Sequence, residues 1–229
     1  MWSVKENAIL ALLPIEQVDI TLENLFSKHQ SVKKSTIIYN YNDPSEYVYL
    51  IKKGTVRLMK LALDGRQITL SILGRLMIFG EADVLNEATY SHYAETMEPC
   101  EICYIHKKDF KNLLEKYGEV KQMILEVMYK DLKHSQQKMT DIAFCDVRTR
   151  LIHEIVNLCD LYGKPYNYKN KIGTLLDLKV SQDDLADLVA SSRETINRIM
   201  HEFKSDDVID YVDRKLILTR EFFDLTSSS

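Results

Sequence analysis

The sequence has few of the residues that interrupt regular structure. Its 229 residues include only seven glycines and four prolines, and we find no low-complexity run and no internal repeat. This composition argues against a disordered chain, and a hydrophobic content of 45% is enough to fill a core in each of two ordinary domains. We therefore expect a compact soluble protein of one or two domains.

Long apolar segments and secretion signals are also lacking. The apolar run at residues 8–13 is flanked by charge, is too short to span a bilayer, and has neither the basic region nor the small-residue cleavage site of a signal peptide. A cytoplasmic protein with no membrane partner is expected. The four cysteines are too few and too scattered for a disulfide framework, so free thiols are expected at Cys100, Cys103, Cys145 and Cys159.

Motifs of the common enzyme classes are missing as well. There is no P-loop, no GxSxG and no HExxH, and the neighbouring carboxylates Asp183 and Asp184 fall in the first turn of an expected helix. We therefore expect a protein that is not an enzyme. The formal net charge of −4 neither favours nor excludes nucleic acid, because binding depends on a local basic face.

Two hydrophobic periods divide the chain. From about residue 35 to 106, apolar residues alternate and an Asp-Gly turn joins two such runs, which predicts an antiparallel β domain, a roll or a barrel. From Lys108 to about Tyr162 there is no proline, and the apolar spacing is helical, with Gly118 expected to separate a short helix from a longer one. A loop or small hairpin is expected at "YGKPYNYKNK", and a second hairpin in "VIDYVDRKLILT", turned at residues 213–215.

Two short helices are expected between these hairpins. Ser181 is followed three positions later by Asp184, and Ser191 by Glu194, so each serine is predicted to begin a helix with a capping box or a close variant. Two helix starts ten residues apart, with a tight turn around Ala190, are typical of a helix-turn-helix.

The second of these helices has a distinct outer face. An apolar stripe is expected to face the core, at Ile196, Ile199, Met200 and Phe203. The opposite side then carries Arg193, Glu194, Asn197 and Arg198. Arginine matches the acceptors of guanine and glutamate can accept from cytosine, so this side is suited to the major groove. The alternative is a solvated face on which Glu194 and Arg198 form an i,i+4 pair worth about 0.2–0.5 kcal/mol.

These motifs together resemble the CRP/FNR family of bacterial transcription regulators. The resemblance is carried by "SRETINRIM", "IAFCDVRTRLIHEIVNLC", "KKGTVRLMK", "DGRQITL" and "FGE". It implies an α+β fold with an antiparallel β-roll, cyclic-nucleotide-binding-like domain at residues 1–118, a dimerisation helix and hinge at 119–144, and a winged helix-turn-helix domain at 145–229. It also implies a homodimer that binds double-stranded DNA and works with RNA polymerase; whether transcription is activated or repressed stays open.

By the same resemblance, Arg193, Glu194 and Arg198 fall on base-contacting positions, and Asn197, where relatives differ, is expected to influence a neighbouring base. Phosphate contacts are expected from Ser181, Gln182, Ser192, Thr195, Arg214 and Lys215. The operator is expected to be an inverted repeat of TGTGA-like half-sites. For the dimer contact, the sequence suggests a seam on the long helix through Val120, Ile124, Val127, Asp131, His134 and Lys138, with a second line packing on the β domain through Met123, Met128, Leu132, Met139 and Ile142. A helix buried within one subunit is the alternative.

The effector is expected to differ from cyclic AMP. The cyclic-nucleotide branch of the family places an Arg-Ser or Arg-Thr pair after its Gly-Glu to neutralise the phosphate, whereas this chain continues from "FGE" without an arginine. "HYAETMEPCEICYI" resembles a strand of the halorespiration regulators, which bind chlorinated aromatic acids. A small organic effector is therefore expected, in an aromatic pocket formed by Tyr90, Tyr93 and Tyr104. The candidate contacts to the effector are Gly80, Glu81, Tyr90, Tyr93 and Ser135.

Other sensing chemistries are weaker alternatives. An iron–sulfur cluster is not expected, because no cysteine precedes residue 100 and Cys100 and Cys103 point to opposite faces if they lie on a strand. Haem is not expected either, although His92, His106 and His134 are available, and no metal site is expected. A thiol switch, of most interest at Cys145 near the hinge, and an effector-independent regulator remain open.

Overall fold

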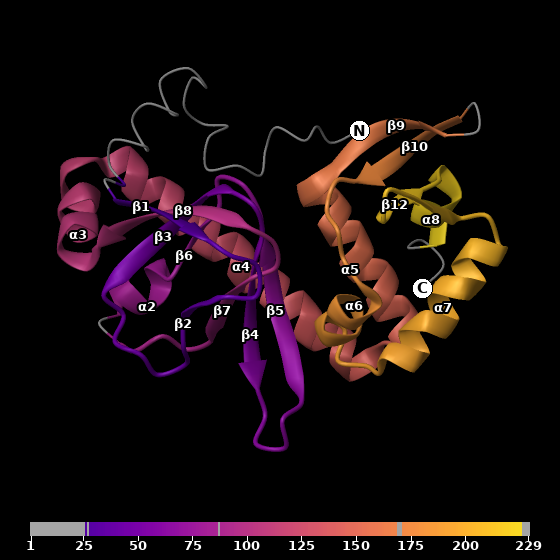
Figure 1. Ribbon diagram of the computed structural model, residues 1–229, viewed down its shortest axis with the longest axis horizontal. Coiled ribbons are helices and arrows are strands. Elements are labelled where there is room, and N and C mark those ends of the chain that lie inside the picture. The colour runs from indigo at the N-terminus through magenta and orange to yellow at the C-terminus, as the bar shows by residue number, and fades with distance from the viewer. Residues whose placement is uncertain (1–25, 27, 87, 169–170, 226–229) are drawn as a thin grey trace. The chain divides into compact units, whose positions relative to one another are not determined.

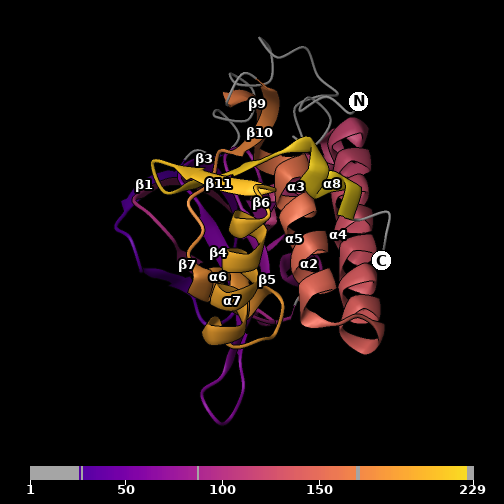
Figure 2. The same cartoon turned by 90° about the vertical axis from the view of Figure 1, so that its right-hand side faces the viewer.

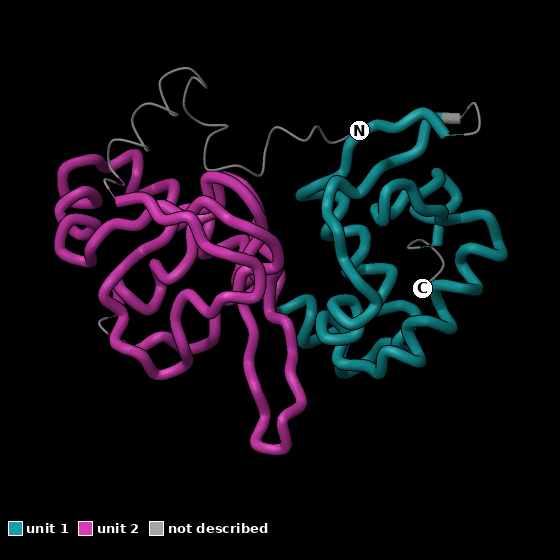
Figure 3. Tube along the Cα trace, viewed as in Figure 1, with its two compact units in different colours: residues 1–7, 136–229 teal, residues 8–135 magenta. Residues whose placement is uncertain are grey.

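The computed structural model describes residues 26, 28–86, 88–168 and 171–225 (Figure 1). The apolar run at residues 8–13 lies outside the described residues, and so does the N-terminal segment for which no signal peptide was predicted. The chain forms two compact units, one containing the described residues up to 135 and the other those from 136 onward (Figure 3). The boundary between the two units falls within the long helix.

The first unit is built on two antiparallel sheets. Their strand orders are β1-β8-β3-β6 and β2-β7-β4-β5. The strands are β1 (Lys28–Val32), β2 (Ile37–Tyr39), β3 (Tyr47–Lys53), β4 (Val56–Leu61), β5 (Gln67–Leu73), β6 (Ile78–Phe79), β7 (Tyr93–Thr96) and β8 (Cys100–His106). The Asp-Gly sequence turns the β4–β5 hairpin, where Gly65 has a φ of 84° that glycine adopts without strain. The predicted antiparallel β domain is confirmed.

Two apolar clusters fill this unit. One gathers Phe26, Val48, Val84, Cys103 and Phe110 with their neighbours, and the other gathers Tyr39, Ile51, Phe79, Tyr90 and Cys100. Two short helices, α2 (Glu81–Leu85) and α3 (Lys107–Lys116), also lie in the described part of this unit. Both cysteines of β8 are buried, in different clusters, as expected for strand positions i and i+3.

The long helix α4 (Gly118–Phe144) follows a break at Tyr117, as the position of Gly118 predicted. The expected seam on this helix is wrong in its first part. Ile124 is buried in the core of the first unit, and Val120 and Val127 pack against that core. The exposed large apolar residues of α4 are instead Leu125, Tyr129, Leu132, Met139, Ile142 and Phe144. Because α4 has more than one apolar line, its spacing alone did not determine which line meets the β domain.

The second unit joins helices to a small sheet of order β11-β12-β10-β9. Its elements after α4 are α5 (Val147–Tyr162), β9 (Gly163–Tyr168), β10 (Lys171–Leu176), α6 (Gln182–Leu188), α7 (Arg193–Ser205), β11 (Ile209–Val212), β12 (Lys215–Leu218) and α8 (Arg220–Asp224) (Figures 1 and 2). Both predicted hairpins are present, and the second turns at Asp213 and Arg214. The α+β class, with a long helix and a C-terminal helix-turn-helix, is confirmed.

Candidate nucleic-acid interface and effector site

The two helices of the helix-turn-helix begin at serines. Ser181 caps α6: its hydroxyl accepts from the Asp184 backbone N–H at 3.1 Å, and the Asp184 carboxylate accepts from the Ser181 N–H at 2.8 Å. This confirms the predicted capping box. The prediction for α7 is wrong by one residue, because Ser192 is the cap and accepts from the Thr195 N–H at 3.2 Å. Ala190 takes up the turn with a φ of 51°, and this places Ser191 outside the helix.

The apolar face of α7 holds the helix in place. Ile196, Ile199, Met200 and Phe203 are buried as predicted. A link from α5 adds to this packing: the Arg148 guanidinium lies 4.5 Å from the centre of the Phe203 ring and donates to Glu202 at 2.9 Å. A cation over an aromatic face is worth about 0.5–1 kcal/mol at an exposed site. Arg148 was not predicted to support α7, because its partners Glu202 and Phe203 lie more than fifty residues away along the chain.

The outer face of α7 is exposed at all four candidate base-contacting residues, Arg193, Glu194, Asn197 and Arg198. The side chain of Arg193 is 69% exposed, and its guanidinium lies 3.5 Å from the carboxylate of Asp183 on α6. The Arg198 guanidinium donates to Glu202 at 2.7 Å. The i,i+4 pair on this face therefore joins Arg198 to Glu202 and not Glu194 to Arg198, so the expected pair is wrong, while the choice between a DNA-binding face and a solvated face stays a prediction.

The candidate phosphate-contacting residues line the start of both helices and the hairpin. Ser181 and Ser192 are exposed at the helix starts, and the Thr195 hydroxyl lies 2.9 Å from that of Ser192. The Gln182 amide donates to the Asn197 side chain at 3.1 Å. This bond joins the two helices, and it ties a residue expected to contact phosphate to one expected to influence a base.

The two cations of the β11–β12 hairpin differ in their surroundings. Arg214 lies exposed in the turn, with a φ of 65°. The ammonium of Lys215 is instead hydrogen-bonded to Asp177, which also accepts from Lys164. These two bonds lower the pKa of Asp177. Arg214 is therefore the cation of this hairpin that is more available to a phosphate.

In the first unit, Gly80 and Glu81 occupy a tight junction. Gly80 begins α2 with a φ of 83°, and a Cβ there would lie 3.2 Å from the Tyr47 carbonyl oxygen and 3.2 Å from the Tyr90 ring. The side chain of Glu81 is buried, and its Oε2 has no hydrogen-bond partner among the described residues. Burial raises the pKa of Glu81 to about 7, and the carboxylates of Asp131 and Asp83 add to the shift.

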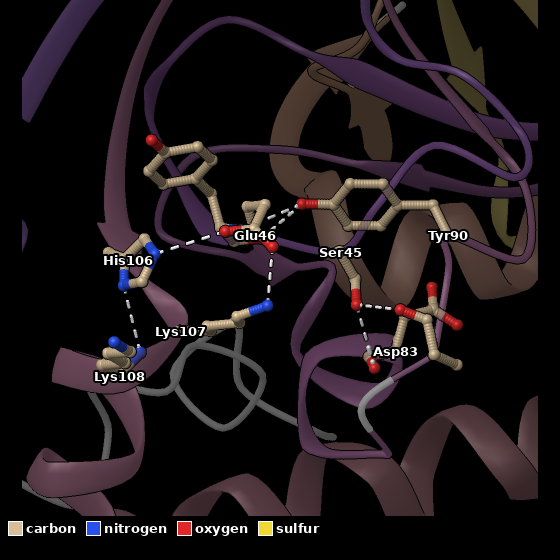
Figure 4. Close-up of polar contacts among 9 residues, drawn as sticks. Ser45, Glu46, Asp83, Tyr90, His106, Lys107 and Lys108 are labelled. Carbon is tan, nitrogen blue, oxygen red and sulfur yellow. Dashed lines mark hydrogen bonds and ion pairs between the residues drawn. The ribbon is translucent and has the colours of Figure 1, made fainter.

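Tyr90 is a buried structural residue of this region. Its ring stacks on Tyr39 with 3.7 Å between centroids, and its hydroxyl donates to the Tyr47 carbonyl oxygen at 2.7 Å (Figure 4). Nearby, Glu46 accepts hydrogen bonds from Lys107, at 2.6 Å, and pairs with His106, at 3.3 Å, which ties the start of β3 to the start of α3. The Tyr90 hydroxyl is thus already used within the fold.

The remaining candidate effector residues are less closely grouped. Tyr93 lies on β7 with its ring 6.4 Å from that of Tyr41. Ser135 is exposed on α4, one turn beyond Asp131, whose charge acts on Glu81. Tyr104 packs edge-on against Tyr47 at 5.3 Å. The structure thus brings Gly80, Glu81 and Tyr90 together.

The thiols and histidines have distinct environments. Cys100, Cys103 and Cys159 are buried, and burial raises the pKa of Cys159 to about 12, which disfavours its reactive thiolate. Cys145 is only partly buried. His92 contacts the Tyr39 hydroxyl at 2.7 Å, and burial lowers the pKa of His92. Within the described ranges, no helix has the length and apolar character needed to cross a membrane.

Comparison with known proteins gives a match for each half of the chain. Residues 29–117 match the model of the cyclic nucleotide-binding domain, and residues 149–222 match that of the Crp-like helix-turn-helix domain. The "cAMP-activated global transcriptional regulator CRP" of Haemophilus influenzae is 27% identical over 182 residues, which is 79% of this chain and 79% of that protein.

Solved structures share the fold. The c-di-GMP responsive regulator CLP of Xanthomonas campestris superposes with a TM-score of 0.71 at 22% identity, covering 88% of this chain and 99% of that one. FixK2 of Bradyrhizobium japonicum has a TM-score of 0.76 at 18% identity, with 86% of this chain and 96% of that one covered. In this chain the two matched domains follow one another, and α4 lies between them.

Proposed function

The chain belongs to the CRP/FNR family of bacterial transcription regulators, and from that premise we propose a homodimeric, sequence-specific DNA-binding protein controlled by a small organic effector other than cyclic AMP. Such a regulator acts in the cytoplasm, with RNA polymerase as its partner. The observation that carries the proposal is the outer face of α7, where four polar side chains are exposed opposite a fully buried apolar stripe. This proposal assigns the chain no catalytic role.

Base recognition is assigned to the first two turns of α7. Arg193 has a planar fork that matches O6 and N7 of guanine, and Glu194 can accept from N4 of cytosine. The exposed contact between Arg193 and Asp183 at 3.5 Å is of the kind worth about 0–1 kcal/mol, so a base can replace it at little cost. When α7 binds DNA, the hydrogen bond between Gln182 and Asn197 is either kept or replaced by a contact to DNA. Asn197 is therefore assigned to adjusting the preference at one neighbouring base.

A dimer is assigned to the exposed apolar line of α4. Leu125, Tyr129, Leu132, Met139 and Ile142 are between 43% and 66% exposed, and their steps of four, three, seven and three residues follow a coiled-coil repeat. A second copy of the same line would cover these side chains. Two α7 helices related by the dimer axis then require an inverted repeat of TGTGA-like half-sites about 34–36 Å apart.

The effector is assigned to the region around Glu81. The buried Oε2 of Glu81, which has no hydrogen-bond partner in the part of the chain that the structure describes, can bond a polar group of a small molecule, and a pKa of about 7 allows the carboxyl to donate or accept. A cyclic phosphate would find no cation in the segment after Glu81, since residues 82–91 contain neither lysine nor arginine and include Asp83. Of the proteins named above, the Haemophilus regulator is called cAMP-activated and CLP is called c-di-GMP responsive, so the fold alone does not specify the effector.

The test combines a half-site library with effector titration. We expect the full chain to select an inverted repeat, to scatter light as a dimer, and to change its affinity for the repeat with a small organic acid but not with cyclic AMP. A monomer at working concentrations on and off DNA would contradict the dimer assignment, and a micromolar dissociation constant for cyclic AMP would contradict the effector assignment. Equal affinity for all sequences would contradict the assignment of α7.

A further inference from the structure

Three side chains with metal-binding donors meet where α4 ends and α5 begins. They are Asp141 and Cys145, one turn apart around the end of α4, and His153, from the second turn of α5. One ligand atom from each lies within 4.8 Å of the other two. All three belong to the second compact unit, and none is among the residues assigned to DNA or effector above.

The cluster is held in place by its neighbours. Asp141 is 6% exposed, and its two oxygens point to different partners: Oδ2 lies 2.9 Å from Nδ1 of His153, and Oδ1 accepts from the Gln137 amide at 2.8 Å. The Cys145 Sγ lies 3.9 Å from the same Oδ1. Beside the cluster, Lys138 pairs with Glu154 at 3.1 Å and gives α4 and α5 a second link. The contacts of Asp141 with His153, Gln137 and Cys145 therefore fix the positions of the three donors.

The set of donors indicates which ion fits. A thiolate, an imidazole and a carboxylate are ligands of Zn²⁺, whereas Ca²⁺ and Mg²⁺ take oxygen ligands only. Zinc–ligand bonds of about 2.0–2.3 Å in a tetrahedron separate the donors by about 3.3–3.8 Å. Oδ2 of Asp141 lies 2.9 Å from Nδ1 of His153, and Oδ1 lies 3.9 Å from Sγ of Cys145, on either side of this range. Since one ligand atom of each residue lies within 4.8 Å of the other two, side-chain rotations that turn one Asp141 oxygen, Nδ1 and Sγ toward a common point bring the donors into position.

We propose that Asp141, Cys145 and His153 bind one Zn²⁺ ion, with water in the fourth position. Binding replaces the thiol proton of Cys145, which is released to solvent. It also replaces the hydrogen bond between Nδ1 of His153 and Oδ2 of Asp141: neutral His153 then carries its one ring proton on Nε2 and offers the Nδ1 lone pair to the ion. The ion ties the last turn of α4 to α5, the helix whose Arg148 holds α7 through Phe203 and Glu202. The alternative is that His153 and Asp141 form only an ion pair, with Cys145 as an ordinary half-buried residue. The site does not depend on the function proposed above.

The test measures metal binding directly, without DNA. The full chain is stripped with a chelator under reducing conditions and titrated with Zn²⁺ in a calorimeter and with Co²⁺ in a spectrophotometer. We expect one Zn²⁺ per chain, a thiolate-to-cobalt charge-transfer band, and a Tm that rises with Zn²⁺. Cys145→Ser should remove the charge-transfer band, and both Cys145→Ser and His153→Gln should weaken Zn²⁺ binding at least tenfold. Acidification should weaken it too, because protons compete for the donors.

Matched controls use the same residue types elsewhere in the same unit. Cys159→Ser and His201→Gln remove a buried thiol and an exposed imidazole, and each should leave the stoichiometry and the cobalt spectrum unchanged. Circular dichroism checks that each variant is folded, and since the cysteine and histidine variants decide the matter, buried Asp141 need not be replaced. Absence of stoichiometric Zn²⁺ binding to the wild-type chain overturns the proposal. Unchanged binding in both Cys145→Ser and His153→Gln, or a persistent charge-transfer band in Cys145→Ser, also overturns it.

Discussion

The two units place their candidate functional residues in opposite environments. On α7, the residues assigned to base recognition are exposed, and the buried residues of that helix only support them. Around Gly80, the residues assigned to the effector are themselves buried, and Tyr90 takes part in the packing and hydrogen bonding of the core. Surface recognition can be altered without loss of the fold, whereas a change in the buried site also alters stability. The predictions below test this difference, from the largest expected effect to the smallest.

Phe203→Ala should have the largest effect, on stability. The side chain is fully buried, contacts the Arg148 guanidinium and packs edge-on against Phe222 at 5.5 Å. Truncating a buried phenylalanine costs about 3–5 kcal/mol in the free energy of unfolding. Urea unfolding measures the loss. The control is Arg193→Ala on the exposed side of the same helix, which should leave stability within about 0.5 kcal/mol of wild type. Equal losses in the two variants would remove the distinction between the faces of α7.

Glu81→Gln should change how stability depends on pH. The folded pKa of about 7 lies above the usual value of 4.5, so the folded chain holds a proton that the unfolded chain releases. Stability is therefore greatest below the unfolded pKa and falls as pH rises through about 7, by up to ~3 kcal/mol.

Glutamine has no such proton, so the variant should lack this decline. Unfolding curves between pH 5 and 8 measure the difference between variant and wild type. Glu115→Gln, exposed on α3, should keep the wild-type profile and serves as the control. A wild-type profile in Glu81→Gln would mean that the buried carboxyl does not titrate in this range.

Arg193→Ala should weaken DNA binding by about 1–3 kcal/mol at the cognate half-site and relax the preference for guanine. The reason is the loss of a bidentate contact to one base. Binding over a half-site library at several salt concentrations measures both effects. Lys204→Ala removes a cation from the last turn of the same helix and should leave the base preference unchanged. Should Arg193→Ala keep both preference and affinity, this face of α7 is only a solvated surface.

The smallest effect is expected at the β11–β12 hairpin. Arg214→Ala should weaken binding to all sequences alike and reduce the slope of log affinity against log salt by about 1. Lys215→Ala should reduce it less, because the Lys215 ammonium already bonds Asp177. Salt titrations of both variants on one cognate and one unrelated duplex measure the slopes. A larger change for Lys215 than for Arg214 would reverse this assignment.

Local features of the chain were predictable where neighbouring residues decide them. The alternation of apolar residues predicted the strands, the Asp-Gly turn predicted the β4–β5 hairpin, and Ser181 with Asp184 predicted the start of α6. The start of α7 was missed by one residue because Ser191 and Ser192 both fit a cap. The choice depended on the conformation of Ala190, with a φ of 51°, which the tight turn between the helices imposes.

The sequence by itself determined the periods, the turns, the exposed face of α7 and the order of the two domains, since each depends on residues within a few positions of one another. Tertiary structure alone decided which face of α4 is covered, why Arg148 matters to α7, and how Asp141, Cys145 and His153 come together. It also decided that Glu81 is buried with one oxygen that no described residue pairs by a hydrogen bond. These features arise from contacts between segments distant along the chain, and a carboxyl acquires its pKa from the atoms that displace water around it.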